Sequence, residues 1–554
     1  MAGRLPSSIE FVLAEGQDPA GFLDALAMHV QVEGLARKSS TAASRKDRVF
    51  LDTADRRLRA SGLVLERDRR IVGGVVRLRL TDAGGAVLSA ESSPPRTDRL
   101  FVADLPEGPL RERIGGPVDV RALLAVGSVR TKVASAAVTD GVGKVVVRLR
   151  FEASEVLRAG VGPVALGVRV KAIPVLGYDR AFRRTVALMA ETLGLGPAKR
   201  SVVDEVVVAS GGRPGGIPTT AKIRLDPASP ANEATMAIGR RLARIVDANL
   251  PGTLADTDTE FLHDLRVSVR RTRSVLKQMK GVLGSDADDA ARLAEVRAGL
   301  RWVQEITGPT RDLDVQLLGW GDLVSHLIPS AATDLEPLRD LLQEHRALAF
   351  GALRRQLRSP RFTGTWQVFR RFVRPSTQEG GGGAARANAE IRRPVAGVAA
   401  KRIRTVYRDI VAKGATITDD SPAVDLHDLR KQGKELRYLL ELFGRMWPAE
   451  AVAPMIGDLK GLQDVLGRFQ DDDIQTTFLR GLGPELAARP GGTDALIALG
   501  LVIERLAADQ GDARRAFADC FGAFSSDANR TLVDRTFRAG KVAAPMDVVA
   551  KVAR

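Results

Sequence analysis

Two segments of the chain place cationic side chains at the spacing of one face of an α-helix. In the first, residues 259–277, the row consists of His263, Arg266, Arg270, Arg273 and Lys277. In the second, residues 424–438, the row consists of His427, Arg430, Lys434 and Arg437. Side chains three or four positions apart share a helix face, so each segment is predicted to present a row of positive charge.

An apolar stripe runs beside each cationic row and predicts which helix face is buried. It consists of Leu262, Leu265, Val269 and Leu276 in the first segment, and of Leu426, Leu429, Leu436 and Leu440 in the second. The rows therefore lie at the boundary of a core. Like charges at this spacing repel by roughly 0.2–0.5 kcal/mol per pair. We interpret two rows of one sign as a surface that binds a polyanion.

Four aspartates leave two alternatives open for the arginines of these rows. The aspartates either pair with the arginines or serve as helix N-caps, and both roles are common for this residue type. They are Asp312, Asp314, Asp471 and Asp473.

Composition narrows the class of partner. A chain of 554 residues is longer than one hydrophobic core usually supports, so two or three domains are predicted. The net charge of +16 and the pI near 10.3 favour nucleic acid, an anionic membrane surface or a phosphate polymer. Only 5% of residues are aromatic, and the rows carry little beyond Tyr438. Nucleic acid is less favoured, because single-strand binders stack bases on aromatic rings.

Cysteine usage and hydropathy predict a cytoplasmic protein without a membrane span. The single cysteine, Cys520, excludes an intrachain disulfide and cysteine-rich metal sites and indicates a reducing compartment. The N-terminal residues lack the apolar core of a signal peptide, and the most apolar window, residues 495–503, is too short to span a bilayer.

A second repeated motif indicates an internal duplication. Residues 300–316 and 459–475 match in apolar type, in Gln, in Gly and in two aspartates. His427 follows His263 by 164 residues, and Gly467 follows Gly308 by 159. Duplication at nearly one offset predicts pseudo-two-fold packing, with the two cationic rows framing a groove.

The chain divides into a strand-rich part and a helical part, so the fold class is α+β multidomain. Residues 1–208 alternate in the manner of strands, residues 209–231 are rich in Gly and Pro and are interpreted as a linker, and residues 232–530 have helical periodicity. The glycine run 378–383 is interpreted as a hinge between helical halves 232–375 and 388–530, and residues 531–554 are a C-terminal tail.

The helical part resembles the conserved histidine α-helical domain, CHAD, over about residues 226–530. The residues that carry the resemblance are the two His-Asp-Leu-Arg motifs at 263 and 427 and the segments 311–315 and 471–474. The resemblance implies two four-helix bundles that bind inorganic polyphosphate on the basic surface between them. The implied contacts are His263, Arg266, Arg270, Arg271, Arg273, Lys277, His427, Arg430, Lys431, Lys434 and Arg437.

The strand-rich part resembles the CYTH fold of triphosphate tunnel enzymes, an antiparallel β-tunnel. Residues 50–55, 65–69 and 197–201 carry this resemblance. The family's opening Glu-x-Glu-x-Lys strand is reduced here to Glu10, and a later strand that supplies acidic metal ligands is basic at residues 166–171. Since Mg²⁺ needs carboxylates, we predict a degenerate tunnel without catalysis and without a bound metal or cofactor. Its expected anion contacts are Arg67, Arg69, Arg79, Arg130 and Lys132.

Other functions remain open at this point. An active CYTH-type triphosphatase would hold Mg²⁺ or Mn²⁺ through Glu10 and Glu91, and an interaction protein would bind nucleic acid or a storage-granule surface through the same cations and residues 547–554. Glu260 and His263 also have the Glu-x-x-His spacing of di-iron bundles. Protonation of His263 and His427 below about pH 6.5 predicts tighter anion binding in acid. The favoured partners are polyphosphate and polyphosphate granules in the cytoplasm.

Overall fold

The computed structural model divides into two compact units, residues 1–218 and 219–554. It describes residues 8–13, 19–32, 36–93, 99–158, 161–283, 287–374 and 392–538. The glycine run 378–383 and residues 539–554 of the predicted tail lie outside this described part. The boundary between units falls inside the segment 209–231 that was interpreted as a linker. Residues on its far side pack on the helical core, as Ala221, Ile223 and Leu225 do.

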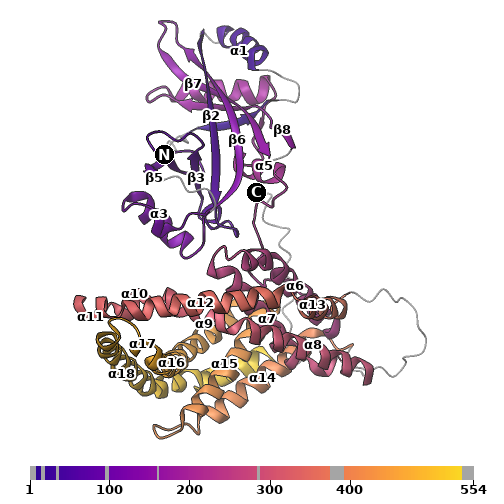
Figure 1. The fold of residues 1–554 in the computed structure, drawn as a ribbon. Helices are drawn as coiled ribbons and strands as arrows, with labels where there is room; N and C mark the ends of the chain where they lie inside the picture. Colours follow the sequence, from indigo (N-terminus) through magenta and orange to yellow (C-terminus); the bar gives the residue numbers. More distant parts are fainter. Residues whose placement is uncertain are drawn as a thin grey trace. The chain divides into compact units, whose positions relative to one another are not determined.

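The first unit is built on a ten-stranded antiparallel sheet (Figure 1). The strands are β1 (Ile9–Val12), β2 (Ala36–Asp52), β3 (Leu63–Asp68), β4 (Val76–Asp82), β5 (Val87–Ser93), β6 (Leu124–Thr139), β7 (Val145–Arg158), β8 (Val161–Ala165), β9 (Arg169–Pro174) and β10 (Gly196–Pro197). The helices are α1 (Pro19–Val32), α2 (Arg57–Ala60), α3 (Pro109–Val118), α4 (Asp179–Ala187) and α5 (Val202–Ala209), with helical turns at η1 (Val102–Asp104) and η2 (Leu188–Thr192).

The strand order is β10-β1-β9-β7-β6-β2-β3-β4-β5, with β8 paired to β7. Within the described residues no pairing joins β5 to β10 or β1, so the sheet is an open path in its hydrogen bonds. An antiparallel N-terminal sheet is confirmed, and its closure into a tunnel stays a prediction.

Alternation along the strands separates an apolar face from a charged face. On β4, Leu78 and Leu80 are buried in a core with Leu65, whereas Arg77 and Arg79 point to the other face. Cross-strand register continues the charged face, because Arg79 pairs with Glu66 and Glu66 pairs with Phe50. The same face therefore runs across β3, β2, β6, β7, β9 and β1.

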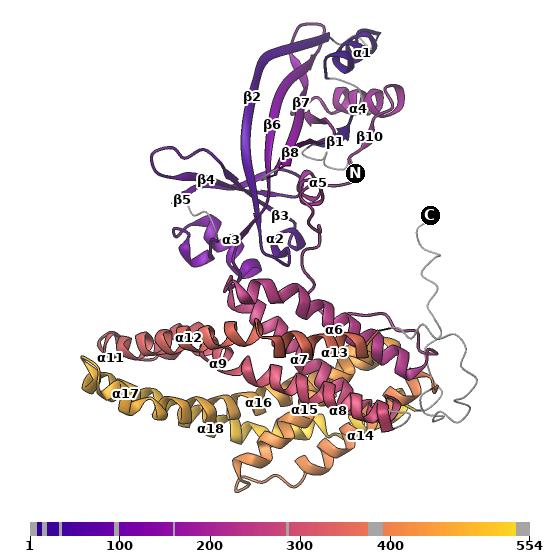
Figure 2. The same ribbon diagram turned by 45° about the vertical axis from the view of Figure 1, so that its right-hand side comes forward.

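The second unit is all-helical (Figure 2). Its helices are α6 (Ala231–Leu254), α7 (Thr259–Gln278), α8 (Ala287–Ile306), α9 (Gly308–Leu318), α10 (Trp320–Val324), α11 (Pro329–Asp334), α12 (Glu336–Leu357), α13 (Pro360–Phe372), α14 (Val395–Gly414), α15 (Ala423–Phe443), α16 (Ala449–Gly481), α17 (Gly483–Ala487), α18 (Gly492–Phe524) and α19 (Asp527–Thr536), with single turns at η3 (Lys280–Val282) and η4 (Gly444–Met446).

The two cationic segments form α7 and α15, which contact each other (Figure 2). Asp258 caps α7, since its carboxylate accepts hydrogen bonds from the backbone N–H of Glu260 at 3.0 Å and of Phe261 at 3.3 Å. The predicted apolar stripes are buried: Leu265 and Leu429 are both 0% exposed. They enter one shared core that draws on both repeats, so the halves are packed together rather than separated.

Close helix contacts recur at the ends of α6 and α14. A Cβ atom added to Gly252 would lie 2.2 Å from the ring of Phe261, and one added to Gly414 would lie 2.0 Å from the ring of Phe521. Both glycines allow an aromatic ring to pack against the helix backbone.

A hydrogen bond between equivalent residues marks the pseudo-two-fold relation. Gln475 Nε2 donates to Gln316 Oε1 at 2.8 Å, and these two glutamines occupy the same position of the second repeated motif. A residue that touches its own equivalent lies near the symmetry axis. The second core, formed by α9–α12 with α16–α18, includes Leu313 and Leu479 of the two helices that carry these glutamines.

Candidate anion-binding site

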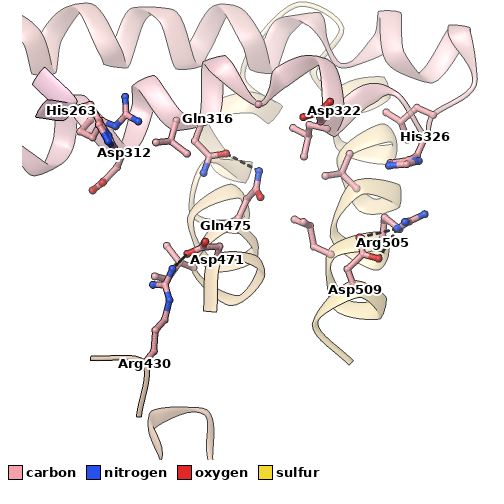
Figure 3. A pocket seen from close by; sticks show the side chains of 18 of the residues that line it. His263, Asp312, Gln316, Asp322, His326, Arg430, Asp471, Gln475, Arg505 and Asp509 are labelled. Carbon is pink, nitrogen blue, oxygen red and sulfur yellow. Dashed lines mark hydrogen bonds and ion pairs between the residues drawn. The ribbon is translucent and has the colours of Figure 1, made fainter. Parts of the chain in front are cut away.

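A cavity of about 1050 Å³ opens between α7, α9, α15, α16 and α18 and is called the basic cavity (Figure 3). Five members of the two cationic rows line it: His263, Arg266, Arg270, Arg430 and Lys434. Figure 3 shows His263 with Asp312, and Arg430 with Asp471, on one side of the Gln316–Gln475 pair. Asp322, His326, Arg505 and Asp509 lie on the other side. The cavity thus collects side chains from both repeats.

The other six residues of the implied contact set lie outside the cavity lining, and four of them are bound to carboxylates. Arg271 contacts Glu441 at 2.6 Å, and Arg437 contacts the same carboxylate at 2.8 Å. Lys277 pairs with Glu435, and Lys431 pairs with Asp428 at 3.2 Å. These contacts neutralise Lys277 and Arg437, the last cation of each row, and periodicity alone does not predict this.

Arg273 and His427 are the other two row members outside the lining. Arg273 is half-buried near Arg301 and Glu305 of α8, and burial lowers its pKa. His427 has its pKa lowered by burial and by the nearby charge of Lys431. His427 therefore contributes to the predicted acid enhancement of binding only at a pH below 6.5.

Arg266 and Arg430 occupy equivalent positions and are held in place by the second repeated motif. Arg266 Nη1 donates to the carbonyl oxygen of Gln304 at 2.9 Å and to Thr307 Oγ1 at 2.7 Å. Arg430 donates to Gln470 Oε1 at 2.9 Å and to Asp471 Oδ1 at 2.8 Å. Burial lowers the pKa of Arg266 to about 10, so it is still a cation at neutral pH. Both guanidinium groups are oriented before any ligand arrives.

Arg270 and Lys434 are also equivalent, and both line the basic cavity. Within the described residues neither forms an ion pair with a carboxylate, and Arg270 lies 5.9 Å from the ring of Tyr438. Burial, followed by the charges of Arg430 and Arg270, lowers the pKa of Lys434 to about 8. A cation whose neighbours disfavour its charge is a strong attractor for an anion.

The two alternatives for the four aspartates are resolved differently for each residue. None is an N-cap, because all four lie inside α9 or α16. Asp471 pairs with Arg430, and the charge of Arg266 acts on Asp312, whose pKa burial nevertheless raises. Asp314 pairs instead with Arg346 of α12 at 2.9 Å. The pairing alternative therefore holds for part of the set.

Sequence reasoning missed two cations and an apolar wall in this cavity. Arg311 lines it beside Asp312, and Arg505 lines it while bound to Asp509 at 2.9 Å. Arg311 sits in the second repeated motif, so that motif was an available signal. The apolar wall includes Val315 and Ile474, which are equivalent positions and about half exposed.

On the charged face of the first unit, carboxylates and cations neutralise each other. Arg48 contacts Glu66 at 2.8 Å and Arg150 contacts Glu152 at 2.8 Å. Glu10 pairs with Arg169 and lies 3.3 Å from Lys171. Glu10, the remnant of the opening acidic motif, is thus bound to cations of the basic strand β9.

The five cations predicted to line a tunnel are not brought together. Arg79 belongs to the charged face, whereas register places Arg67, Arg130 and Lys132 on the opposite one. Arg130 is bound to Asp47 at 3.1 Å, Lys132 is exposed, and Arg69 lies in the turn after β3. Alternation within one strand predicts which of its residues share a face. It does not predict how that strand is aligned with its neighbours.

Across the described ranges no group of three or more His, Cys, Asp or Glu side chains is arranged to hold a metal ion, and this includes the surroundings of Glu260 and His263. No helix in the part of the chain that the structure describes is long and apolar enough to cross a bilayer.

Comparison with known proteins identifies the helical unit. Residues 237–480 match the family model of the CHAD domain, so the second unit contains a CHAD domain. The solved CHAD domain from the plant Ricinus communis is 22% identical, with a TM-score of 0.45, and the match covers 55% of this chain and 96% of that one. PptA from Streptomyces chartreusis is 20% identical, with a TM-score of 0.39, and the match covers 53% of this chain and 99% of that one. The chain matches no curated protein. The resemblance of the helical part is confirmed, and the CYTH resemblance stays a prediction.

Proposed function

We propose that this protein binds inorganic polyphosphate in the basic cavity of its helical unit. The observation that carries the proposal is the pair Arg270 and Lys434, equivalent cations that face one cavity without a carboxylate partner among the described residues. Lys434 is charged at neutral pH although burial and three arginines oppose its charge. An anion in the cavity would relieve that cost.

The chemistry of the lining favours a chain of phosphates over a single anion. Arg266, Arg270, Arg311 and Arg430 offer planar guanidinium groups that pair with two phosphate oxygens at once, and Lys434 offers a point charge. A volume of about 1050 Å³ accommodates several phosphate units. One flexible polyanion makes several of these contacts at once, and the free energies of the contacts add.

The same lining disfavours nucleic acid. Among the described residues that line the basic cavity there is no Phe, Tyr or Trp on which a base could stack. Tyr438 is buried, 7% exposed, and its ring is near Arg270 and Arg271. The protein should therefore prefer a phosphate chain without bases.

We do not assign phosphoanhydride hydrolysis to the first unit. Glu10, Glu66 and Glu152 are each ion-paired with a cation of the sheet, which leaves their charge compensated without a metal. A metal-dependent triphosphatase needs those carboxylates to hold Mg²⁺ or Mn²⁺. Phosphate release from tripolyphosphate that is lost in Glu10→Gln would contradict this assignment.

Salt and chain length test the proposed function. Binding of polyphosphates of increasing length is measured at several salt concentrations by fluorescence anisotropy of an end-labelled chain. Affinity should rise with length until the cavity is filled, and its logarithm should fall linearly with the logarithm of salt concentration, as for other dense phosphate chains. Affinity that is independent of both would sink the proposal. Single-stranded RNA of equal charge serves as the competitor and should displace the chain weakly.

A further inference from the structure

A second cavity of the helical unit is more uniformly basic than the first. It has a volume of about 670 Å³, lies along the first turns of α14 and is called the α14 cavity. Its charged lining residues are Lys280, Arg393, Lys401, Arg402 and Arg404. Among the described residues that line it there is no carboxylate.

The two cavities differ in the charges of the residues that line them. The basic cavity has six Lys and Arg side chains and four aspartates in its lining, whereas the α14 cavity has five Lys and Arg side chains and no acidic group. A concave surface with one sign of charge focuses the field and raises the local concentration of counter-ions. By this measure the second cavity attracts an anion at least as strongly as the first.

The cations of the α14 cavity come from segments far apart in sequence. Lys280 belongs to η3, directly after the cationic helix α7, while Lys401 and Arg404 are three residues apart on α14 and share a face. Phe537, fully buried, forms part of the lining beyond α19. No local sequence pattern joins these residues.

The guanidinium groups in this cavity are only partly satisfied by neutral partners. Arg402 Nη2 donates to Gln278 Oε1 at 2.5 Å, and Arg404 Nη1 lies 3.5 Å from the carbonyl oxygen of Phe537. Among the described residues, the buried Nε atoms of both arginines have no hydrogen-bond partner. The first N–H groups of α14 are already used, because Val395 and Ala396 donate to the carbonyl oxygens of Ser229 and Pro227. The side chains, rather than the helix terminus, therefore define the site.

We propose that the α14 cavity is a second binding site for a short inorganic phosphate chain. The inference extends the proposed function, because it assigns the same class of ligand to a separate set of residues. A volume of about 670 Å³ is within the usual range of small-ligand sites. Gly397 lines the cavity, and a Cβ atom added there would meet nothing within 4 Å, so the space beside α14 is free for a ligand.

Two sites on one unit make binding of long chains bivalent. The cavities contact α7 at Arg270 and Gln278, eight positions apart, which corresponds to roughly 12 Å along a helix. A chain that reaches both sites gains affinity through effective concentration, whereas a chain that fills one site does not. Tripolyphosphate should accordingly bind with two independent equivalents, whereas a long polyphosphate that fills both sites should bind with one chain per protein molecule.

Calorimetric titration of the full-length protein with tripolyphosphate, without divalent metal, tests the proposal. Three variants are compared: Lys280→Ala/Lys401→Ala in the α14 cavity, Arg270→Ala/Lys434→Ala in the basic cavity, and Arg354→Ala/Arg355→Ala on α12 as a charge-matched control that lines neither. Gly397→Leu is a fourth variant that fills the α14 cavity without changing charge. Replacing a helical glycine should favour the fold by about 1 kcal/mol, so lost binding would not reflect unfolding.

The outcomes distinguish this inference from the proposed function. We expect two equivalents in the wild type and in the α12 control, and one equivalent in each cavity variant, including Gly397→Leu. One wild-type equivalent that is lost only in Arg270→Ala/Lys434→Ala overturns the second site and leaves the proposed function standing. One equivalent that is lost only in the α14-cavity variants overturns the proposed function and keeps the second site. Equal stoichiometry in the wild type and Gly397→Leu overturns the inference.

Discussion

Replacing Lys434 with Met should stabilise the helical unit while weakening anion binding. Burial and the charges of Arg430 and Arg270 lower the pKa of Lys434 from 10.5 to about 8. One pKa unit is worth 1.36 kcal/mol, and solvent screens a side chain that is only half-buried, so this lowering corresponds to at most about 3 kcal/mol. At pH 7 this is the cost of keeping the ammonium charged in the folded state. Met retains most of the apolar stem and removes the charge.

The pH dependence gives this prediction its sign. The folded-state pKa is below the unfolded-state pKa, so the cost is complete below about pH 8 and disappears as the pH rises to 10.5. The gain in free energy of unfolding from Lys434→Met should therefore be at most about 3 kcal/mol at pH 7 and shrink towards zero near pH 10.5. Urea unfolding followed by circular dichroism, without phosphate, measures it.

Lys431 provides the matched control for Lys434. It lies on the same helix, is exposed, and is paired with Asp428 at 3.2 Å, so Lys431→Met should change the free energy of unfolding by less than about 0.5 kcal/mol. An unchanged or lower stability for Lys434→Met at pH 7 would refute the reasoning. Equal gains from both variants would also refute it, because the cause would then be general net charge.

Three further predictions follow from individual contacts. Polyphosphate affinity should decrease as the pH rises through about 8, where Lys434 loses its proton, and Lys434→Arg should hold the affinity constant to pH 9.5; an identical decline in both proteins would contradict this assignment. Asp471→Asn should release Arg430 from its 2.8 Å ion pair and tighten polyphosphate binding by about fivefold, which corresponds to about 1 kcal/mol, as measured by anisotropy; weaker binding would mean that Asp471 positions Arg430 for the ligand. Gly414→Ala should lower the free energy of unfolding by about 1–3 kcal/mol, because its Cβ would lie 2.0 Å from Phe521, whereas Gly461→Ala on α16, where a Cβ meets nothing within 4 Å, should not; equal effects would argue against a steric cause.

Helical periodicity predicted the cationic rows but not which of their members face a cavity. The rows share one helix face in α7 and in α15, as the spacing required. Whether a cation is free or neutralised depends on Glu435 and Glu441, which come from α15 and reach across to α7. That distinction needs the relative placement of two helices, and one sequence does not supply it.

The duplication was predictable because two motifs repeat at nearly one offset. Its physical consequence, the Gln316–Gln475 hydrogen bond, follows from an axis between the repeats. The α14 cavity was not predictable, because Lys280, Lys401 and Phe537 share no periodicity and meet only through tertiary packing.

In the first unit, α5 is a helix although its residues ordinarily favour a strand. The residues of α5 are Val-Val-Asp-Glu-Val-Val-Val-Ala, a β-branched run that ordinarily favours a strand. Ser201 caps this helix by accepting a hydrogen bond from Asp204 N at 3.1 Å, and Arg59 holds Asp204 at 2.6 Å. Val206 and Val207 are buried against Phe50 and other residues of the sheet. Tertiary burial and the cap together select the helix.

The central claim is that a phosphate chain binds in the basic cavity, and two double variants test it most directly. Arg270→Ala/Lys434→Ala removes two cations that line the cavity, whereas Lys277→Ala/Arg437→Ala removes two from the same rows that are paired with Glu435 and Glu441 outside it. Both changes remove equal charge from α7 and α15. Affinity for long-chain polyphosphate at fixed salt should fall at least tenfold more in the first variant than in the second. Equal losses in both would contradict the account, because net charge and not the cavity would then govern binding.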